Sequence, residues 1–195
     1  MNYPFQLPRV YEYAELCHRS QVRKYTGEPY ICHPLEVAGL VGIYLPGDRY
    51  AAAMAILHDV VEDTDGTLDD VRSLFGDTVE LGVYFLTDDK PEGMNRATRN
   101  VLYNEKLAKA KDSGLGEKVH TVKCCDIISN GRSVATHDPK FALTWCDEKF
   151  ETLKYLTQAI PSAWMEAYRV LTESKGRAEQ WFLDQKLAKV DVFNG

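Results

Sequence analysis

The chain has 195 residues, of which 45% are hydrophobic and 27% charged, and its net charge is −6. This size and composition predict a single globular domain over residues 1–195. The negative charge disfavours a protein that binds nucleic acid through its phosphates, and no apolar run approaches the roughly 18 residues that a membrane span needs. We therefore expect a small-molecule partner and neither nucleic acid nor a membrane; a homo-oligomer is left open.

The cysteines and the first residues indicate a reducing compartment. Five cysteines are an odd number, and none of them shows C-x-x-C spacing. This disfavours a disulfide framework or a zinc ribbon. Pro4, Pro8, Arg9 and Glu12 interrupt the start of the chain, so we expect no signal peptide. The expected location is the cytoplasm.

Helix start and stop signals follow one another along the chain, and no segment alternates with a period of two. They predict an all-α fold, a helical bundle of roughly eight to ten helices. The expected helices cover residues 11–21, 33–45 and 48–63, two helices that begin at 67 and 77, and then 97–111, 119–134, 138–159, 161–172 and 177–190.

Side chains that accept backbone hydrogen bonds mark several of the expected starts. Asp48 and Asp138 are placed as N-caps, the second before a proline. Thr67 and Asp77 each have an acidic residue three positions later, as in a capping box. Gly76 is expected to end the helix between them.

One acidic cluster lies inside an otherwise apolar segment. His58, Asp59, Glu62 and Asp63 follow the apolar residues 51–57. On a helix, residues four apart stack on one face, so His58 pairs with Glu62 and Asp59 with Asp63. Burying three acids with an imidazole is costly unless a cation or a substrate organises them. The cluster therefore predicts a metal-dependent active site.

Two further residues complete a ligand set. His33 begins one predicted helix and Asp126 lies within another. Together with His58 and Asp59 they offer two imidazoles and two carboxylates, which suit Mn²⁺, Fe²⁺ or Zn²⁺ better than Mg²⁺. A metal ion so held lowers the pKa of bound water and polarises a phosphoryl group. Glu62 and Asp63, one turn beyond, are then candidates for the general base and the group that orients the water.

Three segments in order carry a resemblance to a known family. They read RKYTGEPYICHPLEVA at residues 23–38, ILHDVVEDT at 56–64 and VKCCDIISN at 122–130, and FGDTV follows the second at 75–79. Over about residues 14–155 the chain resembles the HD hydrolase domains of RelA/SpoT-type enzymes. Since no synthetase domain follows, it is similar to a stand-alone small alarmone hydrolase. The segments KPEGMNRATR at 90–99 and DPKF at 138–141 resemble the bacterial short HD phosphohydrolases.

The resemblance implies an HD fold, one Mn²⁺ ion in preference to Fe²⁺ or Zn²⁺, and removal of the 3′-diphosphate from ppGpp or pppGpp. His33, His58, Asp59 and Asp126 would hold the metal, and Glu62 and Asp63 would serve the attacking water. The implied substrate contacts are Arg23 and Lys24 beside the base and phosphates, Asn130 on the ribose or phosphate, and Arg96, Arg99 and Lys123 as candidates for the diphosphate.

Several alternatives remain open from the sequence. The same metal site could act on pppApp or on the 2′-phosphate of NADPH. The chain could also be a non-catalytic alarmone sensor or antitoxin-like partner, or a general nucleotidase. Cys124 and Cys125 are expected to act as small hydrophobes. Beyond about residue 160 the resemblance weakens, and the aromatics there are expected to pack helices or contact a subunit: Trp164, Tyr168, Trp181 and Phe182.

Overall fold

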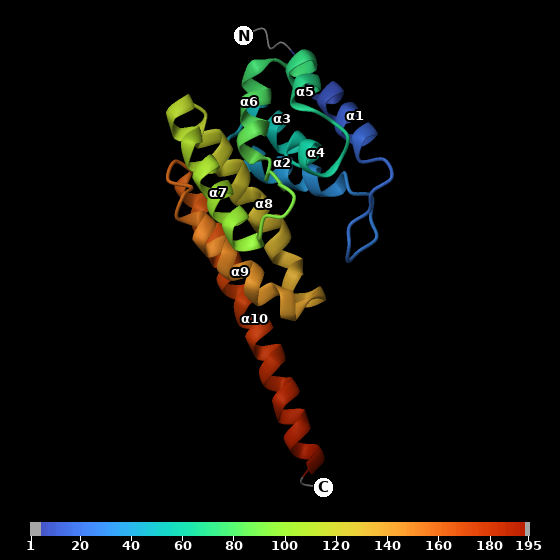
Figure 1. Ribbon diagram of the computed structural model, residues 1–195, viewed down its shortest axis with the longest axis vertical. Coiled ribbons are helices and arrows are strands. Elements are labelled where there is room, and N and C mark those ends of the chain that lie inside the picture. Colours follow the sequence, from blue (N-terminus) through green and yellow to red (C-terminus); the bar gives the residue numbers. More distant parts are fainter. Residues whose placement is uncertain (1–4, 194–195) are drawn as a thin grey trace.

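A computed structural model describes residues 5–193, and over this range helices are joined by loops, with one isolated antiparallel bridge between Val22 and Pro29 (Figure 1). The all-α prediction is confirmed. The helices are α1 (Leu7–Cys17), α2 (Cys32–Tyr44), α3 (Arg49–Leu57), α4 (Val60–Asp63), α5 (Leu68–Phe75), α6 (Asp77–Leu86), α7 (Arg96–Lys109), the 3-10 helix η1 (Ala110–Ser113), α8 (Gly116–His137), α9 (Pro139–Leu153) and α10 (Pro161–Phe193).

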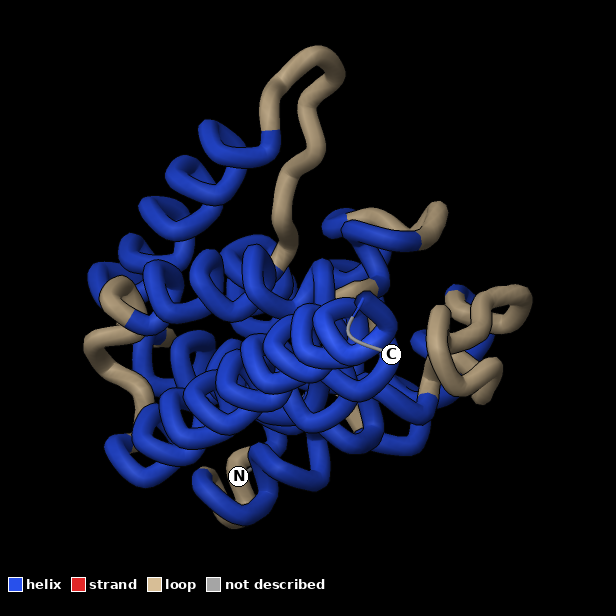
Figure 2. The backbone as a smooth tube through the Cα atoms, turned by 90° about the horizontal axis from the view of Figure 1, so that it is seen from below, coloured by secondary structure: helices blue, strands red, loops and turns tan. Residues whose placement is uncertain are grey.

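Helix α8 runs through the middle of the bundle because almost every face of its central part is covered. It packs against α2, α3, α9 and α10, and Val122, Cys124, Cys125 and Ile128 on it are fully buried. Burial raises the pKa of the Cys124 thiol, so both cysteines fill the core as small hydrophobes, as expected. A second apolar cluster lies between α1, α3, α5 and α6. Figure 2 shows the bundle with loops confined to its edges.

Most of the predicted caps are present. The Asp48 side chain accepts from the backbone N–H of Ala51, and Asp138 accepts from that of Phe141. Thr67 and the third residue of α5 form a reciprocal capping box. Asp77 does not cap a helix: it is the first residue of α6, whose N-cap is Gly76 with a φ of 88°. Glycine supplies this left-handed backbone directly, so α5 and α6 join without a linker.

The predicted helix over residues 48–63 is interrupted, and this is a correction. α3 ends at Leu57 and α4 begins at Val60, leaving His58 and Asp59 in a turn. Asp59 has φ −99° and ψ −6°, outside ideal helical values. Adjacent residues on a continuous helix point about 100° apart. The turn instead lets Asp59 Oδ2 approach His58 Nε2 to 3.2 Å.

The C-terminal part differs from prediction in the opposite sense. Residues 161–193 form one helix, α10, where two were expected. The preceding helix α9 ends at Leu153, whereas it was expected to continue to residue 159. The helix continues through the expected gap because Ser174 is buried there and Glu173 pairs with Arg169 one turn earlier. α10 packs on α8 and α9 and then extends away from the bundle (Figure 1). No described helix combines the length and the apolar character required to cross a membrane.

Candidate active site

Four side chains from three places in the fold converge at the centre of the bundle. His33 comes from the first turn of α2, His58 and Asp59 from the turn after α3, and Asp126 from the middle of α8. His33 Nε2 lies 3.2 Å from Asp126 Oδ1 and 3.7 Å from Asp59 Oδ2, and His58 Nε2 lies 3.8 Å from Asp126 Oδ1. His33, His58 and Asp126 each offer one ligand atom, and these three atoms lie within 4.8 Å of one another. The structure thus brings the predicted ligand residues together.

The Nδ1 atom of each imidazole is hydrogen-bonded, and this fixes the orientation and the tautomer of both rings. His58 Nδ1 lies 2.8 Å from the carbonyl oxygen of Ala55, so it must carry a proton and donate. His33 Nδ1 lies 3.0 Å from Ser129 Oγ, and that hydroxyl donates to Glu36 at 2.8 Å, so His33 Nδ1 also acts as the donor. In the neutral imidazoles the Nε2 atoms therefore keep their lone pairs for a cation.

The charges of the cluster call for a positive centre. Burial opposes protonation of His58, yet Asp59 and Asp126 outweigh it and raise the pKa of His58 well above its ordinary value. Burial likewise opposes ionisation of Asp126, but Lys123 and the two histidines hold its pKa well below the ordinary value. His58 Nε2 is buried without a hydrogen bond. A divalent metal ion in place of a proton at this atom would satisfy the buried nitrogen and both acids, and two imidazoles with two carboxylates suit such an ion.

Glu62 and Asp63, on α4, lie beside the cluster and are held by a loop and a tyrosine. Glu62 Oε2 accepts from the backbone N–H of Asp88 at 3.0 Å, and Lys90 Nζ lies 3.0 Å from Glu62 Oε1 and 2.9 Å from Asp63 Oδ1. The Tyr30 hydroxyl donates to Asp59 Oδ2 at 2.7 Å and contacts Asp63 Oδ2 at 3.4 Å. Burial raises the pKa of Glu62, and the charge of Asp59 adds to this. A carboxylate so perturbed is a better proton acceptor than a solvated one.

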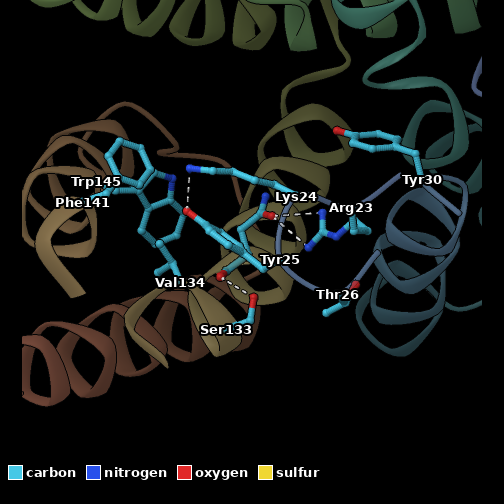
Figure 3. A pocket seen from close by; sticks show the side chains of 10 residues that line it. Arg23, Lys24, Tyr25, Thr26, Tyr30, Ser133, Val134, Phe141 and Trp145 are labelled. Carbon is cyan, nitrogen blue, oxygen red and sulfur yellow. Dashed lines mark hydrogen bonds between the residues drawn. The ribbon is translucent and has the colours of Figure 1, made fainter. Parts of the chain in front are cut away.

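A cavity of about 180 Å³ adjoins the cluster (Figure 3). The 23–30 loop forms one wall, and α8 and the start of α9 form the other. Phe141 and Trp145 supply an aromatic side from α9. The Arg23 guanidinium donates to Asn130 Oδ1 at 3.3 Å, and Asn130 Nδ2 donates to Asp126 Oδ1 at 2.6 Å. This chain of contacts joins the cavity directly to the candidate metal ligands.

The other predicted substrate residues lie around the site, but each is bonded to another side chain. Lys24, whose side chain is 72% exposed, lies 3.5 Å from Asp138 Oδ2. Lys123 Nζ donates to Asp126 Oδ2 at 2.8 Å and is buried, so it orients a candidate ligand. Arg96 forms a bidentate pair with Glu148, and Arg99 lies 3.2 Å from Asp88 Oδ2.

Sequence reasoning assigned no role to several residues that the fold places at the site. Tyr30, Lys90 and Ser129 contact residues of the cluster or Asp63 directly. Lys149 of α9 is close enough for the charge of Asp126 to act on it. Tyr30 and Ser129 lie inside the quoted segments, three residues from His33 and Asp126. This closeness in sequence to the candidate ligands could have indicated a role for both residues. Lys90 begins the segment 90–99 but is distant in sequence from the candidate ligands, and Lys149 lies in none of these segments.

Comparisons with known proteins agree with the geometry. The HD domain family model matches residues 10–82. The guanosine-3′,5′-bis(diphosphate) 3′-pyrophosphohydrolase of Drosophila melanogaster is 34% identical over 130 residues, which are 66% of this chain and 69% of that protein. A probable enzyme of the same name from Synechocystis is 36% identical over 68% of this chain, and a GTP pyrophosphokinase of Streptomyces coelicolor is 38% identical over 66%. The matched regions span only 17% and 15% of those two bacterial proteins.

Two solved structures share the fold. One, described as a metazoan ortholog of SpoT that hydrolyses ppGpp, superposes with a TM-score of 0.75 at 25% identity, covering 89% of this chain and 98% of that one. The other, from Listeria monocytogenes, has a TM-score of 0.62 at 22% identity and covers 78% of this chain and 99% of that one. The second likeness concerns the fold alone.

Proposed function

Since this chain belongs to the RelA/SpoT-type family of HD-domain hydrolases, we propose that it hydrolyses the 3′-diphosphate of ppGpp or pppGpp, releasing pyrophosphate and GDP or GTP. The observation that carries the proposal is the convergence of His33, His58 and Asp126 on one point beside Glu62 and Asp63. The Drosophila relative, named for the same reaction, supports the choice of substrate.

We propose Mn²⁺ as the ion, held by His33, His58, Asp59 and Asp126. The mixed nitrogen and oxygen donors favour it over Mg²⁺, and Fe²⁺ and Zn²⁺ are the alternatives. When bound, the ion would supply a water of lowered pKa and polarise a phosphoryl oxygen. Metal analysis of the purified protein, followed by chelation and addition of each ion in turn, tests the assignment. Activity restored by Zn²⁺ and not by Mn²⁺ would overturn it.

Glu62 and Asp63 are proposed to handle the protons of the reaction. A water oxygen adds to the phosphorus on the ribose 3′-oxygen, the bond from phosphorus to that oxygen breaks, and the 3′-oxygen gains a proton. Glu62, whose pKa is raised by burial, is suited to take the proton that the water loses. Asp63, joined to Tyr30 and Lys90, is suited to orient the water.

The nucleoside is proposed to enter the cavity beside the 23–30 loop. Phe141 and Trp145 offer aromatic surfaces to a purine, and a guanidinium such as that of Arg23 can stack on a base or pair with a phosphate. Asn130 links this cavity to Asp126, so a ribose placed there has its 3′-oxygen directed at the cluster. Arg96, Arg99 and Lys24 are proposed to reach phosphates after exchanging their present acidic partners.

A panel of nucleotides with Mn²⁺ tests the function. Pyrophosphate released from ppGpp faster than from pppApp supports the proposal, and inorganic phosphate released only from NADPH or from nucleoside monophosphates contradicts it. Binding of ppGpp with no turnover under any metal would favour the alternative of a sensor or antitoxin-like partner. The compartment proposed for this activity is the cytoplasm, since all five cysteines are free.

A further inference from the structure

One lysine of α9, Lys149, has no role in the function proposed above and continues the wall of the cavity along this helix. Phe141 and Trp145 line the cavity, and Lys149 is the next residue at the same four-residue spacing. Residues four apart lie one above the other on a helix. Helices α8 and α9 run side by side and antiparallel from the turn at Asp138 (Figure 1), so this row proceeds from the cavity toward the level of Asp126.

The surroundings of Lys149 are unusual for a lysine. Its side chain is partly buried, and the charges that act on it are those of Lys123, Asp126, Glu148 and Asp88. Burial lowers the pKa of Lys149 to about 8, and the positive charge of Lys123 contributes to this. The three acids act on Lys149 from beyond ion-pair distance, since none of them forms a salt bridge with it, so an anion brought into direct contact with this buried ammonium would be favoured.

Lys149 also differs from Arg23, which is bonded to Asn130, and from four cations near the cluster that are already paired with acids. Those pairs are Lys90 with Glu62 and Asp63, Arg96 with Glu148, Arg99 with Asp88, and Lys123 with Asp126. Within the described part of the chain, Lys149 makes no hydrogen bond or ion pair. A phosphate therefore gains the whole interaction with Lys149, without first displacing a carboxylate.

We propose that Lys149 binds the outer phosphate of the substrate's 3′-diphosphate and makes the site select diphosphates over monophosphates. The proposal rests on the function proposed above. With the nucleoside between the 23–30 loop and Trp145 and the inner phosphate at the Asp126 cluster, the outer phosphate continues along the α9 row. An ammonium is a compact charge suited to that contact. Pyrophosphate as a product would keep the same contact until it leaves.

The test compares Lys149→Met with Lys149→Arg and with Lys154→Met. Lys154 is an exposed lysine after α9 that pairs with Glu151. We expect Lys149→Met to lower kcat/KM for ppGpp by about 10- to 100-fold, while the same nucleotide with a 3′-monophosphate is affected less than about threefold. Lys149→Arg should restore most of the loss, and Lys154→Met should match the wild type. Equal losses on both substrates would indicate a structural role and overturn the proposal.

A binding measurement separates this proposal from the proposed function. Calorimetric titration of inorganic pyrophosphate into the Mn²⁺-loaded protein should give a Kd about tenfold weaker for Lys149→Met than for the wild type. An unchanged Kd overturns the role of Lys149 even if the wild type hydrolyses ppGpp. If the wild type releases no pyrophosphate from any nucleotide, the function fails, while the titration still decides the phosphate contact. Lys149→Gln replaces Lys149→Met if thermal melting shows that the latter is unfolded.

Discussion

The two halves of the site are built differently. The proposed metal ligands come from helices or from the turn between two of them, His33 and His58 are each 2% exposed, and a hydrogen bond at Nδ1 fixes each imidazole. On the substrate side, the 23–30 loop and the segment between α6 and α7 supply long cations such as Lys24 and Lys90, which are exposed and bonded to acids. The chemistry is therefore preorganised, whereas recognition rests on contacts that can be exchanged.

The largest expected effect comes from replacing one of the buried candidate metal ligands, which form the rigid half of the site. Asp126→Asn removes a charge that Lys123, Asn130 and both histidines contact. Since a catalytic metal contributes several kcal/mol to the transition state, kcat/KM should fall by about 1,000-fold or more. Metal content and pyrophosphate release measured on the same sample check this. Asp69→Asn, at a side chain 90% exposed, is the matched control. Normal metal content and turnover in Asp126→Asn would contradict the ligand assignment.

Next in size is the loss of the proposed proton acceptors. Glu62→Gln combined with Asp63→Asn keeps the shape of both side chains and removes their charges. Turnover should fall by about 100-fold or more, while binding of ppGpp stays within a few-fold of the wild type. Stopped assays and equilibrium binding separate the two quantities. Retention of normal turnover would remove both residues from the mechanism.

A substitution on the substrate side, the exchangeable half of the site, should have a weaker effect on activity. Arg23→Met removes the guanidinium that contacts Asn130 and lines the cavity. We expect KM for ppGpp to rise about tenfold with kcat little changed, because a recognition contact is lost and the metal ligands stay in place. Arg23→Lys should recover part of the affinity. A fall in kcat as large as that of Asp126→Asn would show that the two halves are not separable.

The smallest expected effect is a shift in the pH dependence of activity, which depends on Glu62 beside the cluster and on Lys90 from the substrate side. Glu62 acts as a base only when ionised, and its raised pKa means that activity is lost, as pH falls, at a higher pH than for an ordinary glutamate of about 4.3. Lys90 favours the ionised form, so Lys90→Met should move this acid limb to still higher pH, by less than about one unit. Profiles of kcat/KM against pH for both proteins measure the shift. A movement to lower pH would exclude Glu62 as the titrating base.

The rigid half could largely be predicted from the sequence, and the exchangeable half could not. His33 and Asp126 lie in apolar helical segments and His58 directly follows one, so their burial follows from the pattern, and the resemblance to a known family implied that they share one site. The interruption at His58 and Asp59 was missed because the apolar spacing from 51 to 61 is compatible with one helix. The continuity of α10 was missed because residues 173–176 are polar with a glycine, whereas tertiary packing decides there.

The partners of the cations could not be predicted for a different reason. Whether Arg96 faces a phosphate or Glu148 depends on how α7 and α9 lie relative to each other, which no local pattern encodes. The same is true of Lys149, whose charged neighbours come from α8 and from the loop after α6 as well as from α9. The resemblance to a known family implied Arg96, Arg99 and Lys123 as candidates for the diphosphate, and it did not indicate this lysine.

The turn between α3 and α4 is also a transferable building unit. An unbroken helix offers inward-facing ligands only every three or four residues, so it must give up several core positions to hold a metal. Here two adjacent residues would both face a bound ion, while the apolar residues of α3 stay buried and Glu62 and Asp63 follow on the next turn. A designer of helical bundles could install half of a catalytic centre by copying this short interruption, without redesigning the packing on either side.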